Sequence, residues 1–187
     1  SRTPDPQTGR ARYGYYEFHT DGAAIGLVPI ASSSGNDGYR IYDERLVEEV
    51  VVLVRLLADF AIEKANCMGE AVLTAEIVEA NRGVHSPSHS LRLCHSRAGP
   101  PEPWPQSHAL FTLPPSEHTV DLNGISTSTV DLLLVGRLVL TDFFQSFGIP
   151  EVPQIDEQAR LRSRYFATRT YPHLVEWAST QGVGVVD

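Results

Sequence analysis

Seven histidines are the first residues of this sequence whose chemistry could serve a metal ion or a proton transfer. His85 and His89 have the i,i+4 spacing that places two ligands on one face of a helix. Ser86-Pro87-Ser88 between them is typical of a loop, however, and no glutamate follows His85. We therefore predict no metal site and no cofactor. The remaining histidines are His19, His95, His108, His118 and His173.

Arginines near the C-terminus form the only basic cluster of the sequence. They are Arg160, Arg162, Arg164 and Arg169, with Tyr165 and Phe166 among them. Guanidinium groups and aromatic rings together can bind phosphates and stack on bases. The alternative is a solvated helix face whose arginines pair with Asp156 and Glu157. Because the formal net charge is −8, we expect nucleic acid to bind this domain weakly if at all.

A polar and aromatic strand face near the N-terminus is the second candidate contact surface. Tyr15, Glu17 and His19 alternate with other residues, so they share one face of a predicted strand. Such a face could bind a ligand or a protein partner. The alternative is a solvated outer face stabilised by cross-strand pairs.

The sequence contains no pattern that would identify a catalytic centre. Two cysteines, Cys67 and Cys94, are too few for a disulfide framework and are predicted to be small buried residues. Cys94 and His95 are neighbours in a predicted strand, so their side chains should point to opposite faces. The loop at residues 31–38 lacks the Gly-Lys-Ser/Thr ending of a phosphate loop. We therefore predict no catalytic residues and no enzymatic activity.

Length and composition favour one folded domain with a helical extension. The chain has 187 residues, of which 42% are apolar. Its most apolar stretch, residues 130–147, is interrupted by Asp131, Arg137 and Asp142, which favours a buried helix over a membrane span. The polar, proline-bearing start predicts a linker cut from a longer protein rather than a signal peptide. We expect a cytoplasmic location and no membrane contact.

Periodicity predicts the elements that position these residues. Alternation around Asp21-Gly22 predicts a hairpin over residues 12–30. Helical spacing predicts a buried helix over residues 43–68, with Asp43 as N-cap and with Leu53 and Leu57 buried. Further strands are expected at 70–80, 90–96, 109–113 and 118–122, and further helices at 129–147, 157–169 and 172–180. Ser128, with Asp131 three residues on, resembles a capping box at the start of the first of these helices, and Asp156 is the N-cap candidate of the second.

This order of elements predicts an α+β fold. We expect an antiparallel sheet of about five strands, with the long buried helix and the C-terminal helices packed on one face. The predicted organisation is a linker at residues 1–11, a core domain at 12–150 and a C-terminal helical extension at 151–187 packed on the core.

One stretch of the sequence resembles a known family. It comprises His19-Thr20-Asp21-Gly22-Ala23-Ala24, then Asp43-Glu44-Arg45-Leu46-Val47 and the helix leading to Gly69-Glu70-Ala71. It is similar to the C-terminal region of multidomain bacterial proteins whose N-terminal domain is Schlafen-type and Alba-like and is expected to bind DNA or ATP. The resemblance spans residues 12–95 and carries no nucleotide-binding residue onto this chain. It implies an accessory module that binds a partner, dimerises or senses a signal.

These observations predict a non-catalytic interaction or regulatory module, with a protein or a second copy as partner. The larger protein would be cytoplasmic and associated with nucleic acid. The alternative is a small-molecule sensor or enzyme domain, with a pocket between the sheet and the C-terminal helices.

Overall fold

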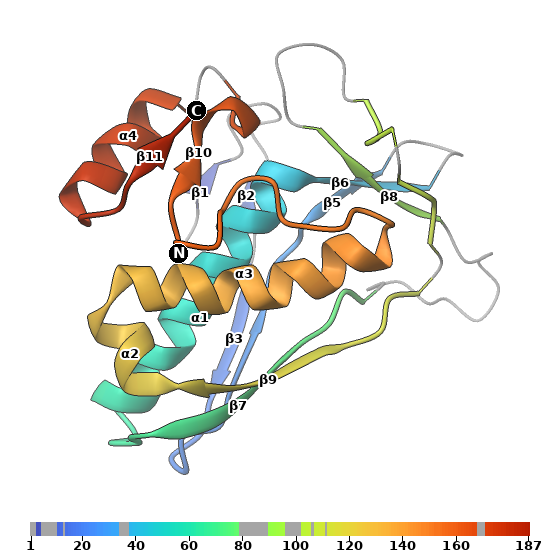
Figure 1. The fold of residues 1–187 in the computed structure, drawn as a ribbon. Helices are drawn as coiled ribbons and strands as arrows, with labels where there is room; N and C mark the ends of the chain where they lie inside the picture. Colours follow the sequence, from blue (N-terminus) through green and yellow to red (C-terminus); the bar gives the residue numbers. More distant parts are fainter. Residues whose placement is uncertain are drawn as a thin grey trace, which may run out of the picture.

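The computed structural model shows an α+β fold (Figure 1). It describes residues 3–4, 11–12, 14–33, 38–78, 90–95, 102–105, 107–110, 112–167 and 171–187. The described α-helices are α1 (Asp43–Glu63), α2 (Leu122–Thr127), α3 (Thr129–Ser146) and α4 (Tyr171–Thr180). The described strands are β1 (Thr3–Pro4), β2 (Ala11–Arg12), β3 (Tyr15–Phe18), β4 (Ala24–Leu27), β5 (Ala31–Ser33), β6 (Tyr39–Tyr42), β7 (Glu70–Ala75), β8 (Leu91–Cys94), β9 (Ser116–Asp121), β10 (Leu161–Arg162) and β11 (Val185–Val186).

The predicted single sheet of five antiparallel strands is wrong, because the strands form several small sheets. β3 pairs with β4, and β7 pairs with β9, both in antiparallel orientation. β6 lies between β5 and β8, and its pairing with β8 is parallel. β1 lies within the predicted linker and β2 at its end, and the two strands form a short antiparallel ladder of their own. Of the predicted strand at 109–113, the described part contributes only a bridge between Leu110 and Leu91.

The hairpin predicted around Asp21-Gly22 is confirmed. β3 and β4 pair from Tyr15–Leu27 to Phe18–Ala24. Gly22 has a φ of +92°, which favours glycine, and the Asp21 carboxylate accepts a hydrogen bond from the Ala23 N–H at 3.0 Å. One face of the hairpin packs on α1, where the rings of Phe18 and Phe60 stack at 4.0 Å.

Helix α1 begins where predicted but ends five residues earlier, at Glu63. Asp43 is its first helical residue rather than its N-cap. Asn66 has a φ of +54°, which no helix can continue, and the Cys67 N–H donates to the Ala61 carbonyl. Two further corrections concern its packing. Leu53 and Leu57 are only partly buried, and Val52 and Leu56 are exposed. On the side of α1 that includes Leu53, the helix is covered only by the narrow β3–β4 hairpin, whose Gly26 approaches the Leu53 side chain.

Helices α2 and α3 complete the core with α1. The predicted cap of α3 is confirmed, because the Ser128 hydroxyl accepts a hydrogen bond from the Asp131 N–H at 3.2 Å. Gly136 of α3 lies against Val51, which lets α3 pack closely on α1. The larger core cluster draws its buried side chains from α1, α3, the β6–β8 pair and residues 149–183. Its fully buried centre includes Leu140, Phe144 and Phe147.

The helix predicted over residues 157–169 is wrong. Asp156 begins a turn, and Ala159, with a φ of +57°, has a left-handed conformation that breaks helical geometry. The chain then forms β10 and a short 3-10 helix, Ser163–Tyr165. The last predicted helix is confirmed as α4, after which β11 pairs in parallel with β10. No helix in the described part of the chain is both long and apolar enough to span a membrane.

Candidate functional site

The predicted contact face formed by Tyr15, Glu17 and His19 is assembled on the hairpin. Their side chains lie on the side of β3 opposite to Phe18, and therefore away from α1. The register sets Leu27 opposite Tyr15 and Ile25 opposite Glu17. We call these five residues the outer face of the hairpin. Its three large apolar side chains are 54% (Tyr15), 49% (Ile25) and 50% (Leu27) exposed, so they form an apolar surface beside the polar groups of Glu17 and His19.

Glu17 organises the polar part of the outer face. The Tyr15 hydroxyl donates to Glu17 Oε2 at 2.6 Å, and His19 Nε2 lies 3.1 Å from Glu17 Oε1. The hydrogen bond to Glu17, followed by the repulsion of its negative charge, raises the pKa of the Tyr15 phenol. The phenol therefore stays protonated and acts as a donor. The geometry orders three side chains on an exposed surface.

The arginines do not form the helical basic face that the spacing predicted. Arg160 Nε donates to Asp156 Oδ2 at 2.7 Å, and a second guanidinium nitrogen donates to Gln158. Arg162 lies 3.5 Å from a Glu151 carboxylate oxygen. Arg164 lies over the ring of Tyr165, 4.8 Å from its centroid. Arg169 lies outside the described residues. Two of the arginines are thus paired with carboxylates. The alternative had named Asp156, which Arg160 meets, but Arg162 meets Glu151 and not Glu157, and the segment is not a helix.

Asp156 holds this turn together. Burial acts to raise the pKa of its carboxyl group, but hydrogen bonds from the Arg160 N–H, the Arg160 guanidinium and the Gln158 N–H outweigh burial, so the pKa is lowered. The two N–H groups donate at 2.8 and 2.9 Å. The ionised carboxylate therefore stabilises a turn, which is the role that an N-cap performs for a helix.

A buried carboxylate and a histidine form a second candidate site that sequence reasoning missed. Asp43 is buried at the start of α1, and its Oδ2 lies 3.3 Å from His95 Nδ1. The ring of His95 lies against Trp104, with centroids 3.5 Å apart, and Tyr165 lies beyond Trp104 at 6.3 Å. The Trp104 indole N–H is buried and has no hydrogen-bond partner in the described part of the chain. The contact sets a buried carboxylate beside an imidazole, a pair of residue types that can exchange protons and hydrogen bonds with a ligand.

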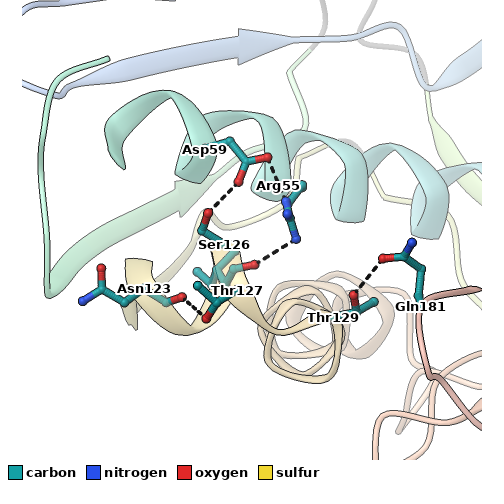
Figure 2. Close-up of polar contacts among 8 residues, drawn as sticks. Arg55, Asp59, Asn123, Ser126, Thr127, Thr129 and Gln181 are labelled. Atoms are coloured by element: carbon teal, nitrogen blue, oxygen red, sulfur yellow. Dashed lines mark hydrogen bonds and ion pairs between the residues drawn. The ribbon is translucent and has the colours of Figure 1, made fainter. Parts of the chain in front are cut away.

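A polar seam joins α1 to α2 (Figure 2). Asp59 accepts hydrogen bonds from Arg55 Nε and from the Ser126 hydroxyl, both at 2.8 Å, and Arg55 also reaches the Ile125 carbonyl at 3.4 Å. A separate bond in the same view joins the start of α3 to the turn after α4, where the Thr129 hydroxyl donates to Gln181 at 3.1 Å. These side chains bond to one another and to the backbone of α2, so we assign the seam a structural role.

Strand β9 is tied to α3 by a similar arrangement. The Ser116 hydroxyl donates to Asp142 Oδ2 at 2.7 Å, and His118 Nε2 lies 2.9 Å from the same oxygen. These are the residue types of a hydrolytic triad, but both the serine and the histidine bind the carboxylate. The histidine therefore does not activate the serine, and the geometry is that of a structural clasp.

The two cysteines are free. Cys94 is buried in the core, and burial raises the pKa of its thiol, which disfavours the reactive thiolate. Cys67 is partly buried, and its sulfur lies 3.7 Å from the Asp21 carbonyl at the tip of the hairpin. The described residues contain no cluster of three or more metal-ligating side chains. His85 and His89 lie outside them.

The register of two strands explains why the Asp43–His95 pair was missed. β6 pairs with β8 in parallel, so Tyr42 lies opposite Cys94, and the next residues along both strands are Asp43 and His95. A reader of the sequence sees two residues 52 positions apart. Only the prediction of a parallel pair between these strands would have brought them together.

Comparison of the chain with protein-family models, with curated proteins and with solved structures finds no match.

Proposed function

We propose that this chain is a non-catalytic interaction module that regulates or dimerises a larger cytoplasmic protein. It docks a protein partner, or a second copy, through the outer face of the hairpin. The observation that supports this proposal best is the exposure of Tyr15, Ile25 and Leu27, about half in each case, on one face. Apolar residues gathered in this way mark interaction sites more often than single exposed residues do.

The polar groups of the outer face would give the contact its specificity. Glu17, between Tyr15 and His19, offers a carboxylate whose two oxygens are already oriented. A partner surface that combines apolar side chains with a donor would match it. Any association of the larger protein with nucleic acid belongs, in this proposal, to another domain, because Arg160 and Arg162 are already paired with carboxylates.

A matched pair of substitutions tests the proposal. A photocrosslinking residue at position 27, in the chain expressed in its host cells, should yield a defined product that mass spectrometry identifies and purified components reconstitute. Leu27→Ser should then weaken the reconstituted complex by roughly tenfold or more, as the loss of a buried leucine predicts. Val72→Ser, an equally simple change at an exposed position of β7, is the control and should have no effect. Equal effects of both substitutions, or no reconstituted complex, would refute the proposal.

The second candidate function is a small-molecule sensor or enzyme domain. The Asp43–His95 pair favours it, because the pair lies where residues near Tyr165 and Ala167 meet the start of α1 and strand β8. A ligand carrying a hydroxyl or amide could donate to His95. A fragment screen by saturation-transfer NMR tests this candidate. Fragments whose binding is lost in His95→Ala but kept in His19→Ala would support it, and the absence of such fragments would contradict it.

A further inference from the structure

One edge of β3 has backbone groups that meet no strand in the described part of the chain. The His19 N–H donates to the Ala23 carbonyl at 2.9 Å, which marks the end of the hairpin ladder. Hydrogen-bonded and non-hydrogen-bonded pairs alternate along an antiparallel ladder, so Tyr15 and Glu17 direct their backbone groups to β4. The N–H and C=O groups of Tyr16 and Phe18 therefore point to the opposite edge. No described residue hydrogen-bonds to them there.

This edge lacks the features that keep other edges from pairing. The strand reads Tyr-Tyr-Glu-Phe, so it contains no proline or lysine, and its register with β4 contains no bulge. The side chains of Tyr16 and Phe18, on the face toward α1, remain 40% and 38% exposed. A two-stranded sheet gains stability when further strands join it. The edge is thus suited to accept a strand.

We propose that β3 pairs in antiparallel orientation with β3 of a second copy of this chain, about a two-fold axis at Phe18. The two hairpins then form one four-stranded sheet. The edge groups of Tyr16 and Phe18 allow the axis to lie at Tyr16, Glu17 or Phe18. An axis at Glu17 would set two carboxylates opposite each other, which is unfavourable. An axis at Tyr16 would set Glu17 opposite Tyr15, which pairs no acid with a base. An axis at Phe18 sets Glu17 opposite His19 of the second copy, and does so twice.

The complementarity of Glu17 and His19 is the reason why we expect a second copy of this chain, and not another protein, to pair with this edge. The two residues are two positions apart on one face, so a single two-fold operation matches each with the other. The same register sets the two Phe18 rings side by side and covers their remaining exposed surface. Tyr15, Ile25 and Leu27 stay open on the outer face. The proposed dimer therefore engages the polar residues of the outer face, Glu17 and His19, and leaves its apolar residues free for the docking function.

Cysteine pairing tests the register directly. In the proposed ladder Glu17 and His19 of the second copy form a non-hydrogen-bonded pair, whose Cα atoms lie about 4.5 Å apart, within disulfide range. Glu17 and its own copy would lie about 8 Å apart, which is outside that range. A mixture of Glu17→Cys and His19→Cys chains should therefore oxidise to a mixed covalent dimer, at roughly tenfold excess over either chain alone. Both chains carry Cys67→Ser, and the buried Cys94 is kept.

Three other outcomes would overturn the proposal. Preferential self-crosslinking of Glu17→Cys would place the axis at Glu17. Equal crosslinking of mixed and single chains would indicate random collision. No crosslink, together with a monomeric wild-type chain in sedimentation velocity, would show that the edge does not pair with itself. Because both positions are about half exposed, urea melts of the two variants should match the wild type, which separates a failed contact from a failed fold.

A charge exchange provides an independent measurement. Glu17→Lys sets a lysine opposite His19 across the dimer, and His19→Glu sets a glutamate opposite Glu17. Each substitution should raise the dimer dissociation constant about tenfold, because two contacts change at once. The double variant sets a lysine opposite a glutamate and should recover most of the loss. Failure of the double variant to recover would overturn the Glu17–His19 register. Leu27→Ser, which tests the proposed docking function, should leave crosslinking unchanged.

Discussion

Three leucines of α1 allow burial to be measured within a single helix. Leu46 is 1% exposed, Leu57 is partly buried and Leu56 is 38% exposed. Each is replaced by alanine, so the change in intrinsic helix propensity is the same at all three positions. Differences among the three free energies of unfolding therefore report packing.

The structure sets the expected order and size of these losses. Leu46→Ala removes a fully buried side chain and should cost about 3–5 kcal/mol, which includes the cavity left behind. Leu56→Ala removes a side chain about 60% covered and leaves no closed cavity, so it should cost about 1 kcal/mol. Leu57→Ala should fall between them, at about 2 kcal/mol.

Urea denaturation followed by far-ultraviolet circular dichroism measures all three variants. The dependence of the unfolding free energy on urea should stay constant across the set, which shows that the same cooperative unit unfolds. A loss at Leu57 as large as that at Leu46 would contradict the packing of α1 described above. It would mean that α1 is covered as completely at Leu57 as at Leu46, near the start of the helix.

Three further predictions concern charge and backbone geometry. Asp156→Asn should lower the free energy of unfolding by about 1–2 kcal/mol near neutral pH. Because the folded pKa of Asp156 is lowered, the wild type should be more stable than the variant above the unfolded pKa of about 3.9, and this difference should disappear as pH falls through the folded pKa. Acid titration of both proteins measures the difference. Gly22→Ala should destabilise the hairpin by about 1–2 kcal/mol or more, since φ is +92° and the added carbon would overlap the Cys67 sulfur; a thermal melt measures this loss, and an unchanged melt would contradict it. Replacing Arg160 and Arg164 by alanine should leave the fluorescence anisotropy of labelled duplex DNA unchanged. If the wild type instead bound tightly, with a steep salt dependence, and the double variant did not, this domain would be a nucleic-acid reader.

Local signals in the sequence predicted local structure. Asp21-Gly22 predicts the hairpin because it satisfies a turn that requires a positive φ. Ser128 predicts the start of α3 because its hydroxyl meets a helical N–H. Asp156 misled the same reasoning. Its carboxylate meets the N–H groups of Gln158 and Arg160 in a turn, which an N-cap also does in a helix, and Ala159 then takes a left-handed conformation.

The candidate sites show the same difference between local and long-range signals. Tyr15, Glu17 and His19 were predicted to share a face because alternation along one strand decides it. The Asp43–His95 pair depends on which strands are neighbours and in which direction they run. Sequence order suggested antiparallel pairing of successive strands, whereas β8 pairs in parallel with β6, which lies before α1 and β7. The sequence contains no local signal for that choice.

The parallel pairing of β6 with β8 also sets an order of events in folding. The β3–β4 turn joins residues that lie close together in the chain, so the hairpin can close within microseconds. Pairing of β6 with β8 closes a loop of 48 residues between Tyr42 and Leu91. Closing this loop costs more conformational entropy than closing the short hairpin turn. We therefore expect the hairpin edge to form while the β6–β8 pair is still open. Nascent chains would then present the edge of β3 before their cores are complete, and the rate of assembly would depend on protein concentration during refolding.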